Sequence, residues 1–120
     1  MSIELLNAVP VLAVADIPAS VAFYRDLLGF TVDFQMDGYP YAGVSREGMT
    51  LHLDGGQHEF AHRPTCCRFH IRGVDGLFAE YDPRGVVKPD ERLATLPHGL
   101  RQFSVLDHDG NRITFAEPVS

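Results

Sequence analysis

The sequence predicts an α+β fold built from two similar modules, each with one strand, one helix and three further strands. Three observations support this prediction. A hairpin pattern occurs twice, from Tyr41 to Leu53 and from Phe103 to Phe115, each time as two extended runs around a polar turn that closes on Gly48 or Gly110. A helical pattern precedes each hairpin. A length of 120 residues is modest for two separate cores, so the halves are expected to share one.

The first module covers about residues 5–54 and opens with a strand from Asn7 to Val14. A helix should follow up to about Leu28, because Asp16 is a favourable N-cap and Gly29 suits a left-handed C-cap. The apolar residues of this helix recur at helical spacing: Ile17, Val21, Tyr24 and Leu28. The module is completed by three strands: Phe30 to Met36, Tyr39 to Ser45 and Met49 to Asp54.

The second module covers about residues 65–118 and repeats the order of the first, within a single domain of residues 1–120. Residues 55–64 are rich in Gly, Gln, His, Arg and Pro and are expected to connect the modules. A long loop from Asp90 to Gly99, flanked by prolines, is expected to line or cover a site. The predicted elements are a strand from Cys66 to Arg72, a helix from Val74 to Arg84, a short strand from Val86 to Lys88, and a hairpin of Leu100 to Asp107 and Arg112 to Glu117.

The composition excludes several classes of protein. The net charge of −6 disfavours nucleic acid as a partner, because phosphates require basic surfaces. No apolar stretch approaches the roughly 20 residues that cross a bilayer, and the N-terminus lacks a basic region followed by an apolar core. A cytoplasmic protein without a membrane partner is therefore expected. Cys66 and Cys67 are adjacent in a predicted strand, where a disulfide would be strained, so both are expected to be reduced thiols.

Two motifs resemble the vicinal-oxygen-chelate superfamily, which contains glyoxalase I, extradiol dioxygenases and bleomycin-resistance proteins. The first is Val11 to Phe30, with Val-Ala-Asp-Ile followed by Phe-Tyr-Arg-Asp-Leu-Leu-Gly-Phe. The second is the hairpin Leu106 to Ile113, in which His108 stands where the family usually has proline. The resemblance extends over about residues 7–117. It implies that the βαβββ modules form curved mixed sheets around a cleft, which is commonly completed in a homodimer.

The resemblance also identifies the positions at which the enzymes of the superfamily carry His or Glu as metal ligands. Here these positions hold Val9, His52, Cys66 and Thr114. Only His52 and Cys66 are competent ligands, whereas a catalytic zinc site normally has three protein ligands and an open position. No cofactor is therefore expected. The alternative is an atypical divalent-metal site with His52 and Cys66, which would make the protein a glyoxalase-like lyase or a dioxygenase-like enzyme.

Two further patterns suggest chemistry but have a structural explanation. The segment from His58 to His62, His-Glu-Phe-Ala-His, matches the H-E-x-x-H pattern with which a helix holds zinc in metalloproteases. Glycines precede it and Pro64 follows it, so an exposed connection between the modules is favoured. Asp107 and Asp109 resemble a carboxylate pair, but they occupy a turn whose conformation itself favours Asp and Gly.

The subfamily that this chain most resembles is the bleomycin-resistance type, which binds a drug and catalyses nothing. A metal-independent protein that sequesters a cationic or aromatic antibiotic, or another aromatic metabolite, is therefore expected. The side chains expected to bind the ligand are aromatic or polar: Phe34, Tyr39, Tyr41, His52, Phe60, Cys66, Phe103 and Thr114.

Three carboxylates are available to meet a cationic group on such a ligand: Asp37, Glu47 and Asp54. The chain departs from the drug-binding branch at His98, where that branch often has Trp. A third interpretation, besides the binding protein and the enzyme, is an interaction module that takes no small ligand.

Overall fold

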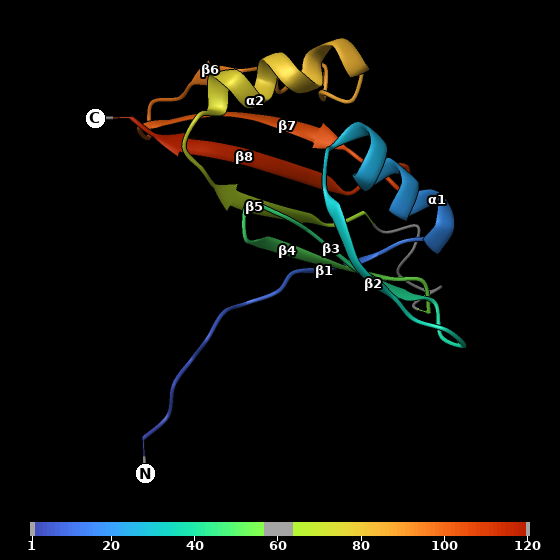
Figure 1. Ribbon diagram of the computed structural model, residues 1–120. Coiled ribbons are helices and arrows are strands. Elements are labelled where there is room, and N and C mark those ends of the chain that lie inside the picture. The colour runs from blue at the N-terminus through green and yellow to red at the C-terminus, as the bar shows by residue number, and fades with distance from the viewer. Residues whose placement is uncertain (1, 57–63, 120) are drawn as a thin grey trace.

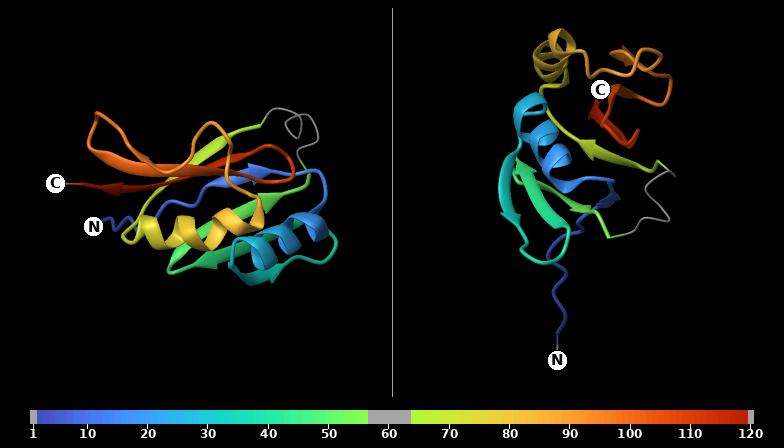
Figure 2. Two further views of the ribbon diagram at one scale, coloured as in Figure 1. Left: turned by 90° about the horizontal axis from the view of Figure 1, so that it is seen from above. Right: turned by 90° about the vertical axis from the view of Figure 1, so that its right-hand side faces the viewer.

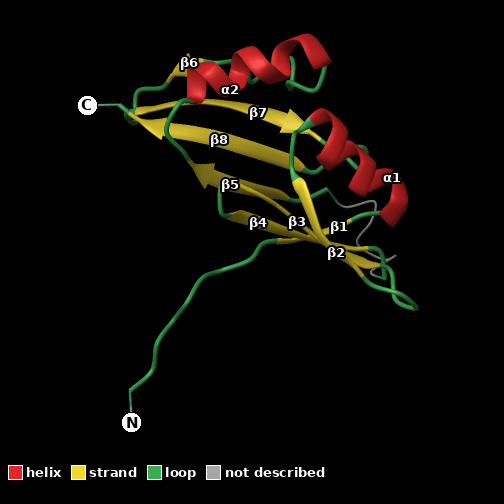
Figure 3. Cartoon of the chain, in the orientation of Figure 1, coloured by secondary structure: helices red, strands yellow, loops and turns green. Residues whose placement is uncertain are grey.

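The computed structural model describes residues 2–56 and 64–119, which form two four-stranded sheets and two helical segments (Figure 1, Figure 3). Sheet A belongs to the first module and has the strand order β1-β4-β3-β2, and sheet B belongs to the second and has the order β5-β8-β7-β6. In each sheet the first strand of the module runs parallel to the last, and the other neighbours are antiparallel. The predicted α+β fold of two βαβββ modules is confirmed.

The helical segment of module one is longer than its regular α-helical part. A π-helical turn, Phe23–Leu27, continues α1, and Gly29 with a φ of 74° ends the segment as predicted. Asp16 takes the N-cap position, although its side chain makes no capping hydrogen bond. The elements of module one are β1 (Val11–Ala13), α1 (Ile17–Ala22), β2 (Thr31–Gln35), β3 (Tyr41–Arg46) and β4 (Met49–Asp54). Those of module two are β5 (Cys66–His70), α2 (Val74–Tyr81), a short 3₁₀ turn (Asp82–Arg84), β6 (Ala94–Thr95), β7 (Leu100–Leu106) and β8 (Arg112–Pro118).

Two predicted strands differ most from the structure, and proline explains both of these differences. The first strand begins only at Val11, because Pro10 has no N–H to donate and the residues before it leave the sheet. The strand expected from Val86 to Lys88 is reduced to a bridge between Val87 and Val105, since Pro89 interrupts the edge. Pairing with β7 resumes further along, so β6 lies inside the segment that was expected to be a loop.

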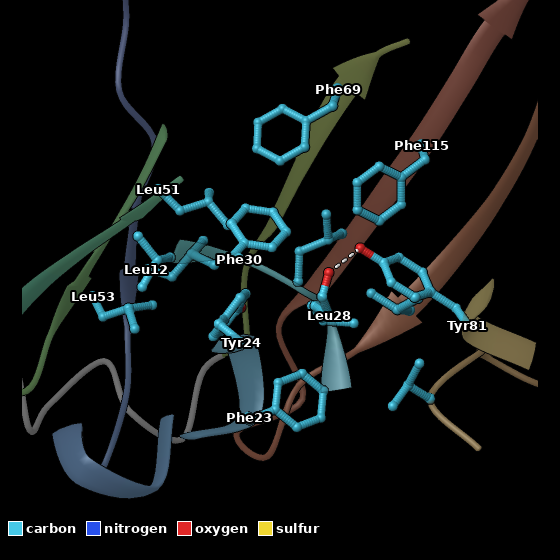
Figure 4. Close-up of a cluster of buried hydrophobic side chains, with 14 of the residues drawn as sticks. Leu12, Phe23, Tyr24, Leu28, Phe30, Leu51, Leu53, Phe69, Tyr81 and Phe115 are labelled. Atoms are coloured by element: carbon cyan, nitrogen blue, oxygen red, sulfur yellow. Dashed lines mark hydrogen bonds between the residues drawn. The ribbon is translucent and has the colours of Figure 1, made fainter. Parts of the chain in front are cut away.

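The two modules share one hydrophobic core, which both helical segments help to fill. Alternate residues of β4 and β8, such as Leu51, Leu53 and Phe115, face this core, together with Tyr24 and residues of β5. Figure 4 shows side chains from both sheets in one cluster, with the hydroxyl of Tyr81 hydrogen-bonded to the Leu28 carbonyl at 2.6 Å. The residues between these core-facing positions, including His52 on β4, therefore face away from the core.

The N-terminal arm, residues 2–8, extends away from both sheets (Figure 1, Figure 2). Its apolar side chains are exposed, and Leu5 reaches 92%. Among the described residues no helix is both long and apolar enough to cross a membrane.

Candidate functional site

Four aromatic or imidazole side chains that the sequence assigned to ligand binding lie together on the outer face of sheet A. We call this group, Phe34, Tyr39, Tyr41 and His52, the aromatic patch. The ring of His52 lies edge-on to Phe34 and to Tyr41, with ring centroids 5.3 Å apart in both pairs. Tyr41 Oη is hydrogen-bonded to His52 Nδ1 at 2.9 Å. The patch thus combines apolar ring surface with a paired hydroxyl and imidazole, the mixture that small-molecule sites use.

Strand geometry and one glycine explain how the patch forms. His52 lies between the buried Leu51 and Leu53, so its ring must face outward. Gly43 pairs in register with both Phe34 and His52 on the two flanking strands. A Cβ atom at Gly43 would lie 2.3 Å from Cε1 of Phe34, which shows that the Phe34 ring rests on the bare backbone. The glycine is therefore part of the patch, and an isolated glycine inside a strand is the sequence signal that points to such a close approach.

The patch is open to solvent, and among the described residues a carboxylate lies beside it. Phe34 is 38% and Tyr39 48% exposed. Asp33 lies on the same face, where its carboxylate accepts a hydrogen bond from the Ser45 hydroxyl at 2.9 Å. Burial, followed by the charge of Asp54, raises the pKa of Tyr41, which keeps that hydroxyl protonated at neutral pH. Negative charge beside aromatic rings favours a cationic group on whatever binds there.

One cation, Arg46, occurs in the strands of sheet A, and it faces away from the patch. Its guanidinium forms a bidentate ion pair with Glu80 of α2, with distances of 2.6 and 2.8 Å. Within the strands of sheet A, no Lys or Arg side chain therefore lies on the outer face beside Asp33.

Three of the other predicted site residues belong to sheet B and lie apart from the patch. Phe103 is 1% exposed and packs in the core against Phe78 and Tyr81. Thr114 is 4% exposed, and its hydroxyl lies 2.7 Å from that of Ser104. Cys66 is exposed at the start of β5.

The outer face of sheet B has its own hollow of about 350 Å³, which differs chemically from the patch. Arg68 on this face donates a hydrogen bond to Gln102 at 2.9 Å. Arg112 donates to Glu91 at 3.0 Å. Thr114 lines the same hollow. Polar and charged groups thus dominate here, whereas rings dominate on sheet A.

Two sequence predictions fall on residues that the structure does not describe. These are Phe60 and the pattern from His58 to His62. Asp107 and Asp109 lie in the turn between β7 and β8, where the Asp107 carboxylate accepts a hydrogen bond from the Asp109 N–H at 2.9 Å. Asp107 therefore has the structural role in the turn that its position favours.

The metal-ligand positions of the superfamily do not offer a metal site here. Val9 has no donor atom, and the His52 imidazole is hydrogen-bonded to Tyr41. Within residues 2–56 and 64–119, no three His, Cys, Asp or Glu side chains converge as metal ligands. The residues at these positions thus do not fit the metal that the enzymes of the superfamily bind.

The family follows from comparison with known proteins. The family model described as "Glyoxalase superfamily protein" matches residues 2–120. This chain belongs to the glyoxalase superfamily. The resemblance inferred from the two motifs is confirmed.

Members of the superfamily named for bleomycin resistance are similar to this chain over nearly all of its length. The bleomycin resistance protein of Geobacillus stearothermophilus is 30% identical over an alignment of 132 residues, gaps included. The alignment covers 96% of this chain and 98% of the relative. The bleomycin-binding protein of Streptomyces verticillus, solved with copper(II)-bleomycin, is 31% identical, with a TM-score of 0.76 and 99% of each chain covered. TnmS3, an antibiotic-binding protein from Streptomyces sp. CB03234, shares the fold, with a TM-score of 0.79 and 24% identity over 98% of each chain.

Proposed function

We propose that this protein binds an aromatic, positively charged antibiotic of the bleomycin kind and sequesters it without a resident metal and without converting it. The aromatic patch carries the proposal, because it presents exposed rings and carboxylates but no cluster of metal ligands within the described residues. The two relatives of 30% and 31% identity, one named for resistance to bleomycin and one for binding it, support this function.

The patch supplies the contacts that such a ligand requires. Phe34 and Tyr41 lie nearly parallel, with an interplanar angle of 15°, so a planar group can stack on either ring. The hydroxyl and imidazole of Tyr41 and His52 provide polar anchors, and Asp33 attracts a cationic substituent.

The proposed functional unit is a homodimer in which a second copy covers the open face of sheet A. The N-terminal arm supports this arrangement, because exposed Ile3, Leu5 and Leu6 have no partner within the described chain. Val11 and Met36 add exposed apolar surface beside the patch. A second copy would bury these side chains and would also place polar residues of sheet B, such as Arg68, within reach of a ligand on the patch.

Isothermal titration calorimetry tests the proposed function directly. Protein dialysed against EDTA is titrated with metal-free bleomycin and with copper(II)-bleomycin, and both are expected to bind. Phe34→Ala and His52→Ala are each expected to weaken binding by about tenfold or more, as is usual for central contact residues. His108→Ala is the matched control, because this exposed imidazole lies in the turn between β7 and β8, where it packs against Phe23 and not against the patch.

Two results would contradict the proposal. The first is the absence of binding to either form of bleomycin and to other cationic aromatic antibiotics. The second is turnover of the ligand that needs added divalent metal, detected by mass spectrometry of the recovered ligand, which would favour the metalloenzyme interpretation instead.

A further inference from the structure

The two hairpin turns of the internal repeat differ in length, and only the longer one joins the modules through its own residues. The turn between β7 and β8 has five residues, 107–111, and reaches module one. There Asn111 Nδ2 donates to the Ala13 carbonyl at 3.0 Å, and the Ala15 N–H donates to Asp109 Oδ1 at 2.9 Å. The turn between β3 and β4 consists of only Glu47 and Gly48. The junction beside this turn has no comparable set of hydrogen bonds from the turn residues within the described chain.

A cavity of about 540 Å³ occupies that junction, between the β3–β4 turn, β5 and α2. The aromatic rings that line it include those of Phe30, Phe69 and Phe115, which Figure 4 draws within the buried cluster, and each is at most 4% exposed. A volume in the range of roughly 300–1,000 Å³ with an apolar lining is typical of small-molecule sites. The cavity is on the core side of the sheets, whereas the aromatic patch is on the outer face of sheet A.

One free guanidinium at the cavity offers a partner for an anionic ligand. Arg46 and Glu80 line one wall, but they neutralise each other through their bidentate ion pair. Arg72 also lines the cavity, and its exposed guanidinium forms no hydrogen bond or ion pair with any described residue. A free guanidinium is a specific partner for a carboxylate, which it can bind through two parallel hydrogen bonds. Glu47 also lines the cavity, and its carboxylate opposes an anion.

We propose that this cavity is a second ligand site, for a small amphipathic carboxylate whose ring or chain enters between the modules while its carboxylate binds Arg72. The site is independent of the aromatic patch, because the two share no lining residue. It arises from the unequal turns of the repeat, since the matching space at the other junction is bridged by residues 107–111.

The structure offers a substitution that fills the cavity without straining the backbone. Gly76 lines the cavity from α2, and a Cβ atom placed there would meet no heavy atom within 4 Å. Replacing a helical glycine also tends to favour the helix. Gly76→Leu should therefore occupy the site while the protein stays folded. Ala79→Leu is the matched control, because Ala79 is exposed on the same helix and does not line the cavity.

Calorimetric titration with naphthalene-2-carboxylate and its uncharged analogue 2-naphthamide tests the proposal. Both are titrated into the Phe34→Ala/His52→Ala protein, so that the aromatic patch does not contribute. The carboxylate should bind about tenfold more tightly than the amide, as expected for a charge-assisted hydrogen bond. Arg72→Gln should remove this preference, Glu47→Gln should increase it, and Gly76→Leu should abolish binding of both compounds while Ala79→Leu leaves it unchanged.

The outcomes separate this site from the aromatic patch. Equal affinity for the two compounds, unchanged binding in Gly76→Leu, or no binding at all would overturn the proposal, whatever the result with bleomycin. Binding that appears only after Leu5 and Leu6 are replaced by Asp would assign the cavity to the N-terminal arm of a second copy and would also overturn it.

Discussion

Tyr24 Oη donates a hydrogen bond of 2.8 Å to Asp107 Oδ2 and thereby joins the helical segment of module one to the β7–β8 turn of module two. Both residues are buried. The same carboxylate accepts the Asn111 N–H at 2.8 Å and the Asn111 side-chain amide at 3.0 Å. Burial first, and then the charge of Asp107, raises the pKa of Tyr24 well above its usual value. The hydroxyl therefore remains a donor throughout the physiological range.

Tyr24→Phe should destabilise the fold by about 1–3 kcal/mol, because a buried carboxylate loses one of its donors. The ring itself should stay in place, since it packs edge-on against Phe23 and Phe30 with centroids 5.5 and 5.9 Å away. Urea unfolding at neutral pH measures the change. Tyr39→Phe is the control, because Tyr39 is largely exposed, and it should alter the free energy of unfolding by less than about 0.5 kcal/mol. Equal stability of the two variants would refute a structural role for the Tyr24 hydroxyl.

Gly43→Ala should impair the aromatic patch more than it impairs the fold. The added methyl group would lie 2.3 Å from the Phe34 ring, so that ring must move away from His52. We expect bleomycin affinity to fall by about tenfold, comparable to the loss of a central contact residue. Gly76→Ala serves as the control, because its Cβ meets open space. Calorimetry and near-ultraviolet circular dichroism measure binding and ring packing, and unchanged binding in Gly43→Ala would exclude Phe34 from the site.

Local alternation predicts which side of a strand faces the core, but not what covers the other side. Leu51 and Leu53 are buried and His52 faces outward, as alternation requires. The same rule turns Thr114 outward on β8, yet Thr114 is buried. Residues 90–92 line the hollow on the outer face of sheet B together with Thr114. This segment runs along the edge of β7, where the Ser104 N–H donates a hydrogen bond to the Glu91 carbonyl at 3.1 Å. Because that contact joins residues distant in sequence, periodicity does not reveal it.

The face of the sheet on which Phe103 lies is likewise not predictable from local sequence. From the sequence alone, the Phe103 ring could face either a ligand cleft or the hydrophobic core. In the structure it pairs with Phe115 and lies on the core face with Val105. The size of the inter-module cavity also escapes prediction, although the two turn lengths that produce it are visible in the printed sequence.

Glu80→Gln should destabilise the protein at neutral pH by about 1 kcal/mol, since Glu80 and Arg46 form a partly exposed bidentate pair. The hydrogen bond from Arg46 lowers the pKa of Glu80 in the folded state. A lowered pKa contributes stability that is present above the unfolded value and is lost as the pH falls through the folded value. The difference in unfolding free energy between Glu80→Gln and the unmodified protein should therefore shrink below about pH 4. Urea titrations at pH 7 and pH 3 measure it.

Asp26→Asn is the control for that experiment, because Asp26 pairs with its neighbour Arg25 on an exposed surface. It should change stability little at either pH. A difference for Glu80→Gln that grows at low pH would have the wrong sign and would show that the ion pair does not stabilise the fold.

Replacing Leu5 and Leu6 with Asp should convert the proposed homodimer into monomers. The two side chains are among the most exposed apolar groups of the described chain, and a partner surface would have to accept both charges. Sedimentation velocity across a range of protein concentrations measures the change. Asn7→Asp adds a charge to the same arm without removing apolar surface, and it should leave the dimer intact. A monomeric unmodified protein would contradict the proposed dimer outright.

Alkylation should distinguish the two adjacent cysteines. Cys66 is exposed, whereas burial raises the pKa of the Cys67 thiol to about 11. Because the thiolate is the reacting species, Cys67 should be almost entirely in its unreactive thiol form at pH 8. Iodoacetamide is therefore expected to modify Cys66 first, as measured by peptide mass spectrometry over time. In 6 M guanidinium chloride the two rates should converge, since the difference arises from burial in the folded state. Faster reaction at Cys67 in the folded protein would mean that the second position of β5 is not packed against the core as the structure places it.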